Sequence, residues 1–219
     1  MSLSVPQHIL DALTDVTMPR LPVEADAGAH LKLAGHEIPV FRSGSIVIGS
    51  GAAGLRAAVE MKRRDVDVTI ISQSAWGGTS ACSGSDKQTL HTANTKDQGD
   101  NFQDMAASIR AGGAMDEDTA YIEAVGSIRA MASLQYLGLP LPQDALGGTL
   151  RYQTDHDEVG RATSVGPRTS RLMVKVLAEE ALRLNVPFFN HTTAVKVLTE
   201  RQGDQTSVVG VLAIRPKTS

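Results

Sequence analysis

The chain has 219 residues, of which 42% are hydrophobic and 4% aromatic, and its formal net charge is −3. These values are ordinary for a globular protein of one large domain or two small ones, and without a basic stripe they disfavour nucleic acid as a partner. No apolar run reaches the roughly 18 residues that a membrane span needs, and no signal peptide is recognisable. The single cysteine, Cys82, excludes an intrachain disulfide and fits a reducing cytoplasm.

Residues 1–35 have the mixed character of a leader that precedes the main domain. Residues 6–16 are expected to form a short amphipathic helix, which Pro19 and Pro22 end. This helix has no basic face, so docking on its own domain or on a partner is favoured over membrane attachment. Residues 36–41 are expected to be extended and to lead into the first core strand.

A glycine turn links that strand to a helix. Residues 45–48 are expected to form a buried strand around the apolar run 46–48, and an alanine-rich helix is expected from residue 54 to about residue 64. Between them Gly49 permits a tight turn, Gly51 leaves room for a diphosphate, and Gly54 allows the helix to pack closely on the strand. The helix N-terminus adds free N–H groups and a partial positive charge. The pattern predicts a dinucleotide site, with a purely structural turn as the alternative.

The second strand, over residues 67–71, is followed by Ser72 and Gln73. A standard dinucleotide fold has Asp or Glu there to accept from the ribose hydroxyls, so their absence weakens an NAD interpretation. No Arg stands in the first positions after the strand, which leaves an NADP interpretation unsupported.

Residues 74–98 are poor in periodic apolar positions and rich in small and hydroxylated side chains. Such a stretch is either disordered or a binding loop, and its exposed backbone N–H groups favour binding. Cys82 has no His or basic neighbour, so a buried or ligand-lining role is favoured over a nucleophile.

Two helices are expected next, one over residues 101–111 and one that starts near Asp116 or Asp118 as N-cap and continues to Leu137. The second is expected to bury one face, because apolar residues recur every three to four positions at Ile122, Val125, Ile128, Met131 and Leu134. The acid- and histidine-rich segment 152–158 suggests metal binding, but its spacing favours a solvated loop. A further helix is expected over 167–185, and strands over 187–190, 193–198 and 207–214.

Together these elements resemble the flavoprotein subunits of the succinate dehydrogenase and fumarate reductase family over about residues 36–215. The resemblance implies an α/β, Rossmann-like FAD-binding fold with a central parallel sheet and an antiparallel β-meander. It also implies that residues 36–219 are the N-terminal portion of that domain, incomplete because the capping domain and closing strand are missing. Residues 47–58 are similar to the family's FAD diphosphate motif, and residues 77–80 to the loop that approaches the flavin ring.

Gly78 stands where membrane-bound members place a flavin-linking His, which implies non-covalent FAD. Gly84 and Ser85 are a loose match to a second glycine pair, and the strand of Ala194 resembles the segment that meets the adenine. The cofactor-binding residues that the resemblance implies are Gly49, Ser50, Gly51, Ala52, Ala53, Gly54, Ser72, Gln73, Gly77, Gly78, Thr79, Ser80, Gly84, Ser85 and Ala194.

The family's catalytic and substrate-binding residues follow the point that corresponds to Ile214, so no catalytic residue and no metal ligand is expected here. The resemblance implies the FAD-binding portion of a flavin oxidoreductase for a small dicarboxylate or enoate, completed by a second subunit or by a missing C-terminal half. Two alternatives stay open. One is a non-catalytic nucleotide-binding module that acts through a partner, and the other is a truncated product that binds nothing tightly.

Overall fold

The computed structural model describes residues 16–82, 87–94, 100–113, 115–154 and 157–216, so the helix expected over residues 6–16 lies almost wholly outside it. The chain forms two compact units. Thr17–Cys82 and Leu177–Ser219 make the parallel-sheet unit, while Met1–Val16 and Ser83–Val176 make the inserted unit. The division between a leader and a main domain at residue 35 stays a prediction.

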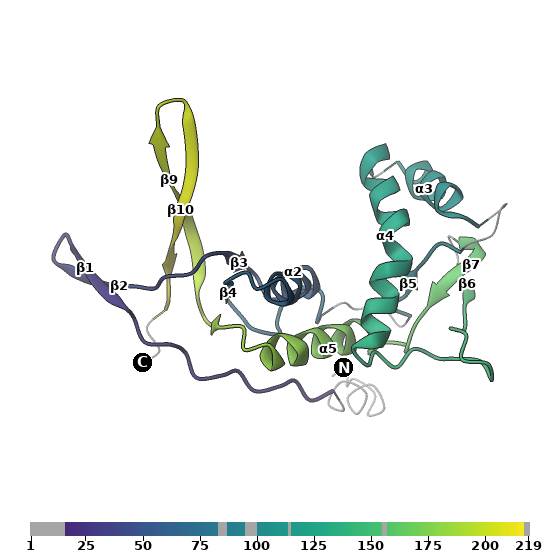
Figure 1. The fold of residues 1–219 in the computed structure, drawn as a ribbon. Coiled ribbons are helices and arrows are strands. Elements are labelled where there is room, and N and C mark those ends of the chain that lie inside the picture. Colours follow the sequence, from purple (N-terminus) through teal and green to yellow (C-terminus); the bar gives the residue numbers. More distant parts are fainter. Residues whose placement is uncertain (1–15, 83–86, 95–99, 114, 155–156, 217–219) are drawn as a thin grey trace, which may run out of the picture. The chain divides into compact units, whose positions relative to one another are not determined.

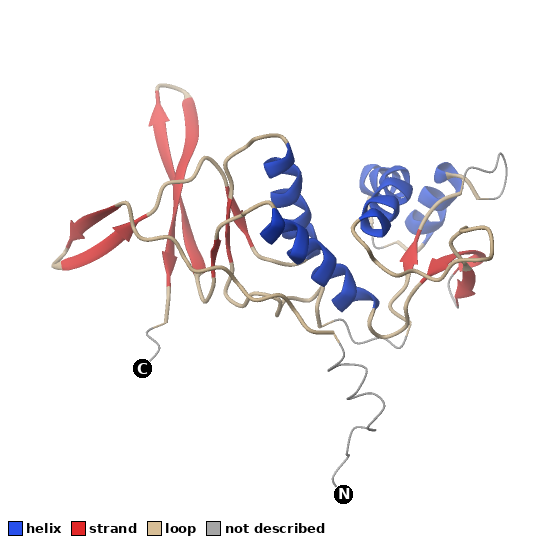
Figure 2. Ribbon diagram, turned by 60° about the horizontal axis from the view of Figure 1, so that its bottom comes forward, coloured by secondary structure: helices blue, strands red, loops and turns tan. Residues whose placement is uncertain are grey.

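A parallel sheet forms the centre of the parallel-sheet unit (Figures 1 and 2). Its strands are β3 (Ile46–Ile48), β4 (Thr69–Ile71) and β8 (Phe188–Phe189), in the order β3-β4-β8. Helix α2 (Ala52–Arg63) connects β3 to β4 and contacts both strands. The strand, glycine turn, helix and second strand expected from the sequence are therefore confirmed.

The core of this unit lies between α2 and the sheet. Leu55, Val59 and Ile70 are completely buried, and α5 (Thr169–Arg183) adds Leu177, which is 2% exposed. The apolar spacing that predicted α2 and α5 thus corresponds to real buried faces.

Helices α2 and α5 are also connected by a salt bridge between their side chains. Arg63 donates from Nη2 to Oε1 of Glu180 at 2.8 Å, and Arg183 donates from Nε to Oε2 of the same carboxylate at 2.6 Å. Hydrogen bonding by Arg183, followed by Arg63, lowers the pKa of Glu180 to about 2, although burial acts in the opposite direction. Glu180 is 7% exposed, so its charge is stabilised by these two cations rather than by water.

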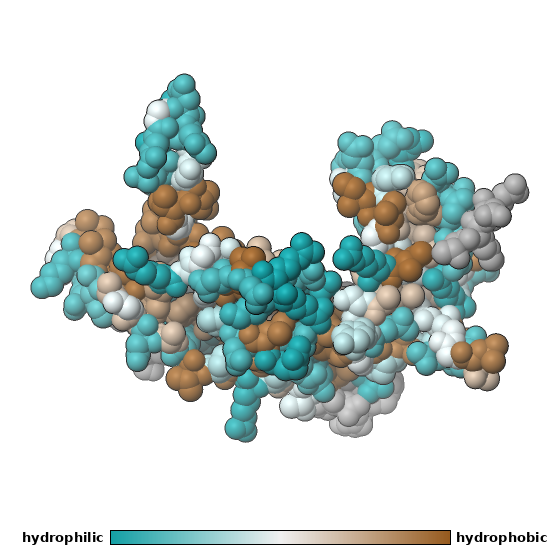
Figure 3. All heavy atoms as spheres, viewed as in Figure 1, coloured by the Kyte–Doolittle hydropathy of each residue, from teal (hydrophilic) through white to brown (hydrophobic). Residues whose placement is uncertain are grey.

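Two antiparallel hairpins complete the unit. Strands β1 (Ala29–Leu33) and β2 (His36–Val40) pair with each other, so the extended segment expected from residue 36 belongs to a hairpin that crosses residue 35. Strands β9 (Thr193–Gln202) and β10 (Gln205–Ile214) form the second hairpin, which confirms the antiparallel pair expected near the C-terminus. The β9–β10 hairpin has a hydrophilic tip and hydrophobic residues nearer its base (Figure 3).

The inserted unit contains α3 (Phe102–Ala111), α4 (Glu117–Tyr136) and an antiparallel sheet. The sheet order is β5-β7-β6, from β5 (Leu90–His91), β7 (Asp157–Thr163) and β6 (Tyr152–Thr154). Both helices begin at the residues that the sequence indicated. Asn101 accepts from the N–H groups of Gln103 and Asp104, and Asp116 accepts from that of Thr119.

The face that α4 buries differs from the expected one. Met131 and Leu134 are buried as predicted, but Ile122, Val125 and Ile128 are 70%, 50% and 37% exposed. The buried positions of the helix are Ala120, Ala124, Ser127, Met131 and Leu134. Small side chains on this face let α4 approach α3, where Ala124 packs with Met105 and Ala106. Close approach of the two backbones thus outweighs burial of the larger β-branched residues.

The solvated loop expected over residues 152–158 is also wrong, because β6 and β7 occupy most of it. Asp157 is 5% exposed, and its carboxylate accepts from the backbone N–H of Arg161. The Arg161 guanidinium donates from Nε to Oδ1 of Asp100 at 2.8 Å and lies 3.5 Å from Asp157 Oδ1. Burial lowers the pKa of nearby Arg151, and the charges of the same two aspartates oppose this. Asp157 therefore belongs to a buried ion network, which composition alone does not distinguish from a solvated surface.

Within the described ranges, no group of three His, Cys, Asp or Glu residues is arranged to hold a metal ion. The same part of the chain contains no helix with the length and apolar character of a membrane span.

Candidate functional site

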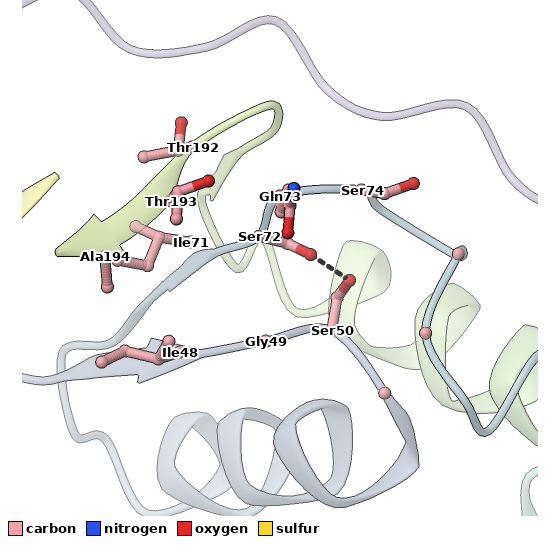
Figure 4. A pocket seen from close by; sticks show the side chains of 13 residues that line it. Ile48, Gly49, Ser50, Ile71, Ser72, Gln73, Ser74, Thr192, Thr193 and Ala194 are labelled. Carbon is pink, nitrogen blue, oxygen red and sulfur yellow. Dashed lines mark hydrogen bonds between the residues drawn. The ribbon is translucent and has the colours of Figure 1, made fainter. Parts of the chain in front are cut away.

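A cavity of about 330 Å³ lies at the carboxyl ends of β3 and β4 (Figure 4). This is the edge at which open α/β sheets bind ligands, and the volume falls within the range of about 300–1,000 Å³ for ligand sites. The residues that line it are Ile48, Gly49, Ser50, Gly51, Ile71, Ser72, Gln73, Ser74, Gly77, Gly78, Thr192, Thr193 and Ala194.

The floor of the cavity is the glycine turn between β3 and α2. Gly49 has φ +101°, a conformation that favours glycine, and its N–H donates to the Ile71 carbonyl at 2.8 Å. A Cβ on Gly54 would lie 2.2 Å from the Gly49 carbonyl oxygen and 3.2 Å from Cγ1 of Val47. Both glycines are therefore required by the backbone geometry, one for the turn and one for helix–strand packing.

Gly51 is the N-cap of α2 and contributes no side-chain cap, and the first turn of the helix holds no acidic residue. The positive end of the helix dipole thus faces the cavity unneutralised by a carboxylate from that turn. The Ala52 N–H donates to Oγ of Ser80 at 3.2 Å, and a Cβ on Gly51 would lie 3.2 Å from the same oxygen. The loop that contains Ser80 therefore packs directly against the glycine turn.

The far wall is built by the end of β4 and the start of β9. Ser72 is 7% exposed, and its Oγ accepts from Oγ of Ser50 at 2.9 Å, so the two side chains face each other across the strand ends (Figure 4). The Ser72 carbonyl accepts from the Thr192 N–H at 2.9 Å. This bond brings Thr192 and Ala194 to a site otherwise formed by residues 48–78.

Eight of the residues expected at the site line the cavity together: Gly49, Ser50, Gly51, Ser72, Gln73, Gly77, Gly78 and Ala194. Ala52, Ala53 and Gly54 form the first turn of α2 beside it, and Ser80 contacts that turn through its hydroxyl. Thr79 is exposed and is not among the lining residues. Gly84 and Ser85 lie outside the described residues.

The individual residues expected at the site did not include five of the lining residues: Ile48, Ile71, Ser74, Thr192 and Thr193. The first three directly flank residues that the sequence did indicate, so a wider reading of the strand ends would have included them. Thr193 likewise flanks Ala194, whereas Thr192 carries no local signal, because only the pairing of distant segments places it there.

Cys82 differs from its expected role. It is exposed rather than buried, and it does not line the cavity. Its backbone N–H bonds to the carbonyls of Gly78 and Thr79, and its Sγ lies 3.7 Å from the Gly77 carbonyl oxygen. Cys82 therefore closes the turn of residues 78–82 through its backbone and does not itself line the cavity.

The chemistry of the lining fits a dinucleotide. Its hydroxyls and amide come from Ser50, Ser72, Gln73, Ser74, Thr192 and Thr193, and no lining side chain is charged. Such groups hydrogen-bond ribose and phosphate oxygens, while the glycines let a diphosphate approach the start of α2. Ser72 and Gln73 stand at the end of β4 and both line the cavity.

Comparisons with known proteins agree with this geometry. The model of the family described as FAD binding domain matches residues 44–219. The 8-methylmenaquinol:fumarate reductase flavoprotein subunit of Wolinella succinogenes is 28% identical over 181 residues, which are 79% of this chain and 29% of that protein. The chain thus spans less than a third of the length of this curated relative.

Two solved structures share the fold. FrdA of the E. coli quinol fumarate reductase matches with a TM-score of 0.63 and 19% identity, over 80% of this chain and 29% of that one. A 3-ketosteroid-Δ4-(5α)-dehydrogenase from Rhodococcus jostii RHA1 matches with a TM-score of 0.63 and 21% identity, over 79% of this chain and 42% of that one. The α/β fold expected from the sequence is confirmed by these matches. The chain therefore belongs to the FAD binding domain family of flavin-dependent oxidoreductases, and its cofactor is FAD.

Proposed function

We propose that this chain holds FAD non-covalently in the cavity at the ends of β3 and β4, as the FAD-binding portion of a fumarate reductase- or succinate dehydrogenase-like oxidoreductase. One observation carries the proposal. The glycine turn, the end of β4, the loop around Gly78 and the start of β9 surround a single space, although they span residues 48–194 in the sequence. Convergence of these segments supports a binding role over a purely structural turn.

Each wall suits one part of the cofactor. The diphosphate lies over residues 49–54, where the start of α2 offers N–H groups and the positive end of its dipole. Ser72 and Gln73 receive the ribose, and Ala194 borders the adenine. Residues 78–80 approach the edge of the flavin ring. These assignments rest on the resemblance to the flavoprotein family, and they are supported by the glycine turn, the end of β4 and the start of β9 bordering one cavity.

Non-covalent attachment is supported by the lining itself. It contains neither His nor Cys, the side chains that most readily attach to a flavin. A Cβ on Gly78 would have Gly51 Cα, at 4.0 Å, as its nearest neighbour, so the loop leaves open space there.

FAD supplies hydride chemistry when it is bound, and the residues of this chain place it and set its surroundings. The uncharged lining holds no side chain that titrates near neutral pH, so we assign no proton transfer and no catalytic residue to this chain. The same observation supports a second candidate, a nucleotide-binding module that acts only through a partner. A small dicarboxylate or enoate is the proposed substrate class of the complete enzyme, because the curated relative is a fumarate reductase flavoprotein subunit.

We also propose that further polypeptide, either a second subunit or additional sequence, completes the fold. Strand β3 is at the edge of the parallel sheet, and its Ile46 and Ile48 are 39% and 56% exposed. Parallel sheets are normally covered on both faces, so these side chains suit a surface that another element covers. A cytoplasmic location is part of the proposal and rests on the single cysteine.

The proposal is tested by the visible absorption spectrum of the purified protein and by titration with FAD. We expect flavin absorbance that acid releases into solution. Gly51→Leu should abolish it, because φ of −73° is open to Leu but its Cβ would lie 3.2 Å from Ser80 Oγ, so the side chain crowds the contact between the glycine turn and the loop. Gly126→Leu has open space around its Cβ and should retain the flavin. Protein that stays colourless at every FAD concentration would refute the binding proposal.

Enzyme and module are separated by a second assay. Co-purification with the polypeptide that completes the fold should restore dye-linked fumarate reduction if the chain is an enzyme component. FAD binding without electron transfer to any acceptor in that complex would favour the module.

A further inference from the structure

The segment from Thr17 to Glu24 is bonded to the rim of the cavity. Trp76 donates from Nε1 to the Pro19 carbonyl at 3.1 Å, and its ring packs edge-on against Phe188 with centroids 5.4 Å apart. The backbone of Trp76 has φ +62°, a conformation that bulky residues rarely adopt without surrounding contacts. Trp76 lies between Ser74 and Gly77, which both line the cavity. The Pro19 contact therefore helps to hold the cavity loop in an unfavourable backbone conformation.

Glu24 makes a second connection, toward the same loop. Its Oε1 accepts from the Asn190 N–H at 3.1 Å. Oδ1 of Asn190 in turn accepts from the Ala75 N–H at 2.9 Å. Glu24 thus reaches the residue next to Trp76 through one side chain.

The other oxygen of Glu24 reaches the opposite wall. Its Oε2 accepts from Nη1 of Arg215 at 2.7 Å. Arg215 also donates to Oγ1 of Thr192, at 2.9 Å from Nη2 and 3.2 Å from Nε. Thr192 is 8% exposed and lines the cavity, and its Oγ1 donates to the Asn190 carbonyl at 2.8 Å. A single carboxylate therefore links the loop wall and the β9 wall.

The Glu24–Arg215 ion pair is too exposed to water to act mainly as a stabilising interaction of the core. The Glu24 and Arg215 side chains are 33% and 45% exposed, and ion pairs in contact with water contribute little to folding. The bonds of the strap nevertheless reach the cavity walls: Trp76 and Ala75 lie in the lining loop, and Thr192, which Arg215 contacts, is itself a lining residue. The geometry thus fits positioning better than global stability.

We propose that Glu24 is a positioning residue of the FAD site, and that residues 17–24 act as a strap that fixes loop 74–78 and Thr192 relative to each other. This inference rests on the proposed function, since the held walls are those assigned to the cofactor. Without the strap both walls remain in the fold but move independently, so FAD must order them on binding and its affinity falls.

Trp76 is the only tryptophan of the chain, so its intrinsic fluorescence reports on the loop without any cofactor. We expect Glu24→Ala to shift Trp76 emission and to weaken FAD affinity about fivefold, the size of one partly exposed interaction. Glu37→Ala is the matched control, because Glu37 is exposed on β2 and does not line the cavity. It should change neither readout.

Arg215→Gln separates the two walls. It removes the contacts with Thr192 but leaves the Asn190 connection, so FAD affinity should fall while Trp76 emission stays as in the wild type. Unchanged emission in Glu24→Ala, or altered emission with unchanged FAD affinity, would overturn the inference. Wild-type protein that binds no FAD would refute the proposed function instead. The Trp76 emission of Glu24→Ala, compared with the wild type, would then be the only test of whether Glu24 holds the loop.

Discussion

Substitution of Gly54 by Ala tests the contact on which the glycine turn depends. The added Cβ would lie 2.2 Å from the Gly49 carbonyl oxygen and 3.2 Å from Cγ1 of Val47. The first of these is a backbone atom that no rotamer change can move. Ala is accepted at the third glycine of the dinucleotide pattern in other folds, so the prediction depends on the helix–strand distance found here.

The expected cost follows from two opposing effects. Helix α2 and strand β3 must separate by up to about 1 Å, which forfeits a quarter to a half of the dispersion energy of the contacting atoms. Overpacking of this kind costs about 1–3 kcal/mol, and contact with rigid backbone places Gly54→Ala at the upper end. Ala gains about 0.5–1 kcal/mol over Gly inside a helix. The net loss in unfolding free energy should therefore be about 2 kcal/mol.

This loss can be measured by urea denaturation. The fluorescence emission of Trp76 monitors the unfolding, because Trp76 belongs to the parallel-sheet unit. FAD titration of the same variant should show weaker binding, since the turn moves with the helix. Gly126→Ala in α4 is the control, because no atom lies within 4 Å of its added Cβ. It should keep or slightly raise stability. A Gly54→Ala protein with the wild-type midpoint would refute the view that close packing requires this glycine.

Three further substitutions test the ion networks and the site. The folded pKa of Glu180, about 2, is below its ordinary value of 4.5, so its charge stabilises the fold above pH 4.5 and this contribution disappears as the pH falls toward 2. Glu180→Gln should cost about 1–3 kcal/mol in urea unfolding at pH 7 and less than half of that at pH 3. Exposed Glu200→Gln should change neither value. Arg161→Met removes the cation from a buried carboxylate pair and should cost about 3–5 kcal/mol, with exposed Arg129→Met neutral. Gln73→Glu supplies a charged acceptor for the ribose and should tighten FAD binding about fivefold in a fluorescence titration, and unchanged affinity would contradict its place at the ribose.

Local patterns determined much of this protein. Gly49, Gly51 and Gly54 stand between a strand and a helix at a spacing that steric limits enforce over only a few residues, so the turn could be read directly. The start of α4 was predicted to within two residues, at Asp116 or Asp118, because a cap acts within one helical turn, and Asp116 is the cap in the fold. The same holds for the β9–β10 hairpin, whose turn at Gly203 is encoded locally.

Other features were decided only when distant segments met. The buried face of α4 depends on how closely α3 approaches it. Small residues occupy that contact, although Ile122 and Val125 have the apolar spacing of a buried face. Asp157 is acidic in the sequence and buried in the fold, because Arg161 compensates its charge.

The cavity divides in the same way. The floor of the cavity could be predicted from the short glycine pattern, because a single backbone turn positions all of its atoms. Its far wall exists because the Thr192 N–H reaches the Ser72 carbonyl, and Glu24 joins that wall from a segment 168 residues earlier than Thr192. Such contacts leave no periodicity in the sequence, because they are selected by the packing of the whole unit and not by any neighbouring residue.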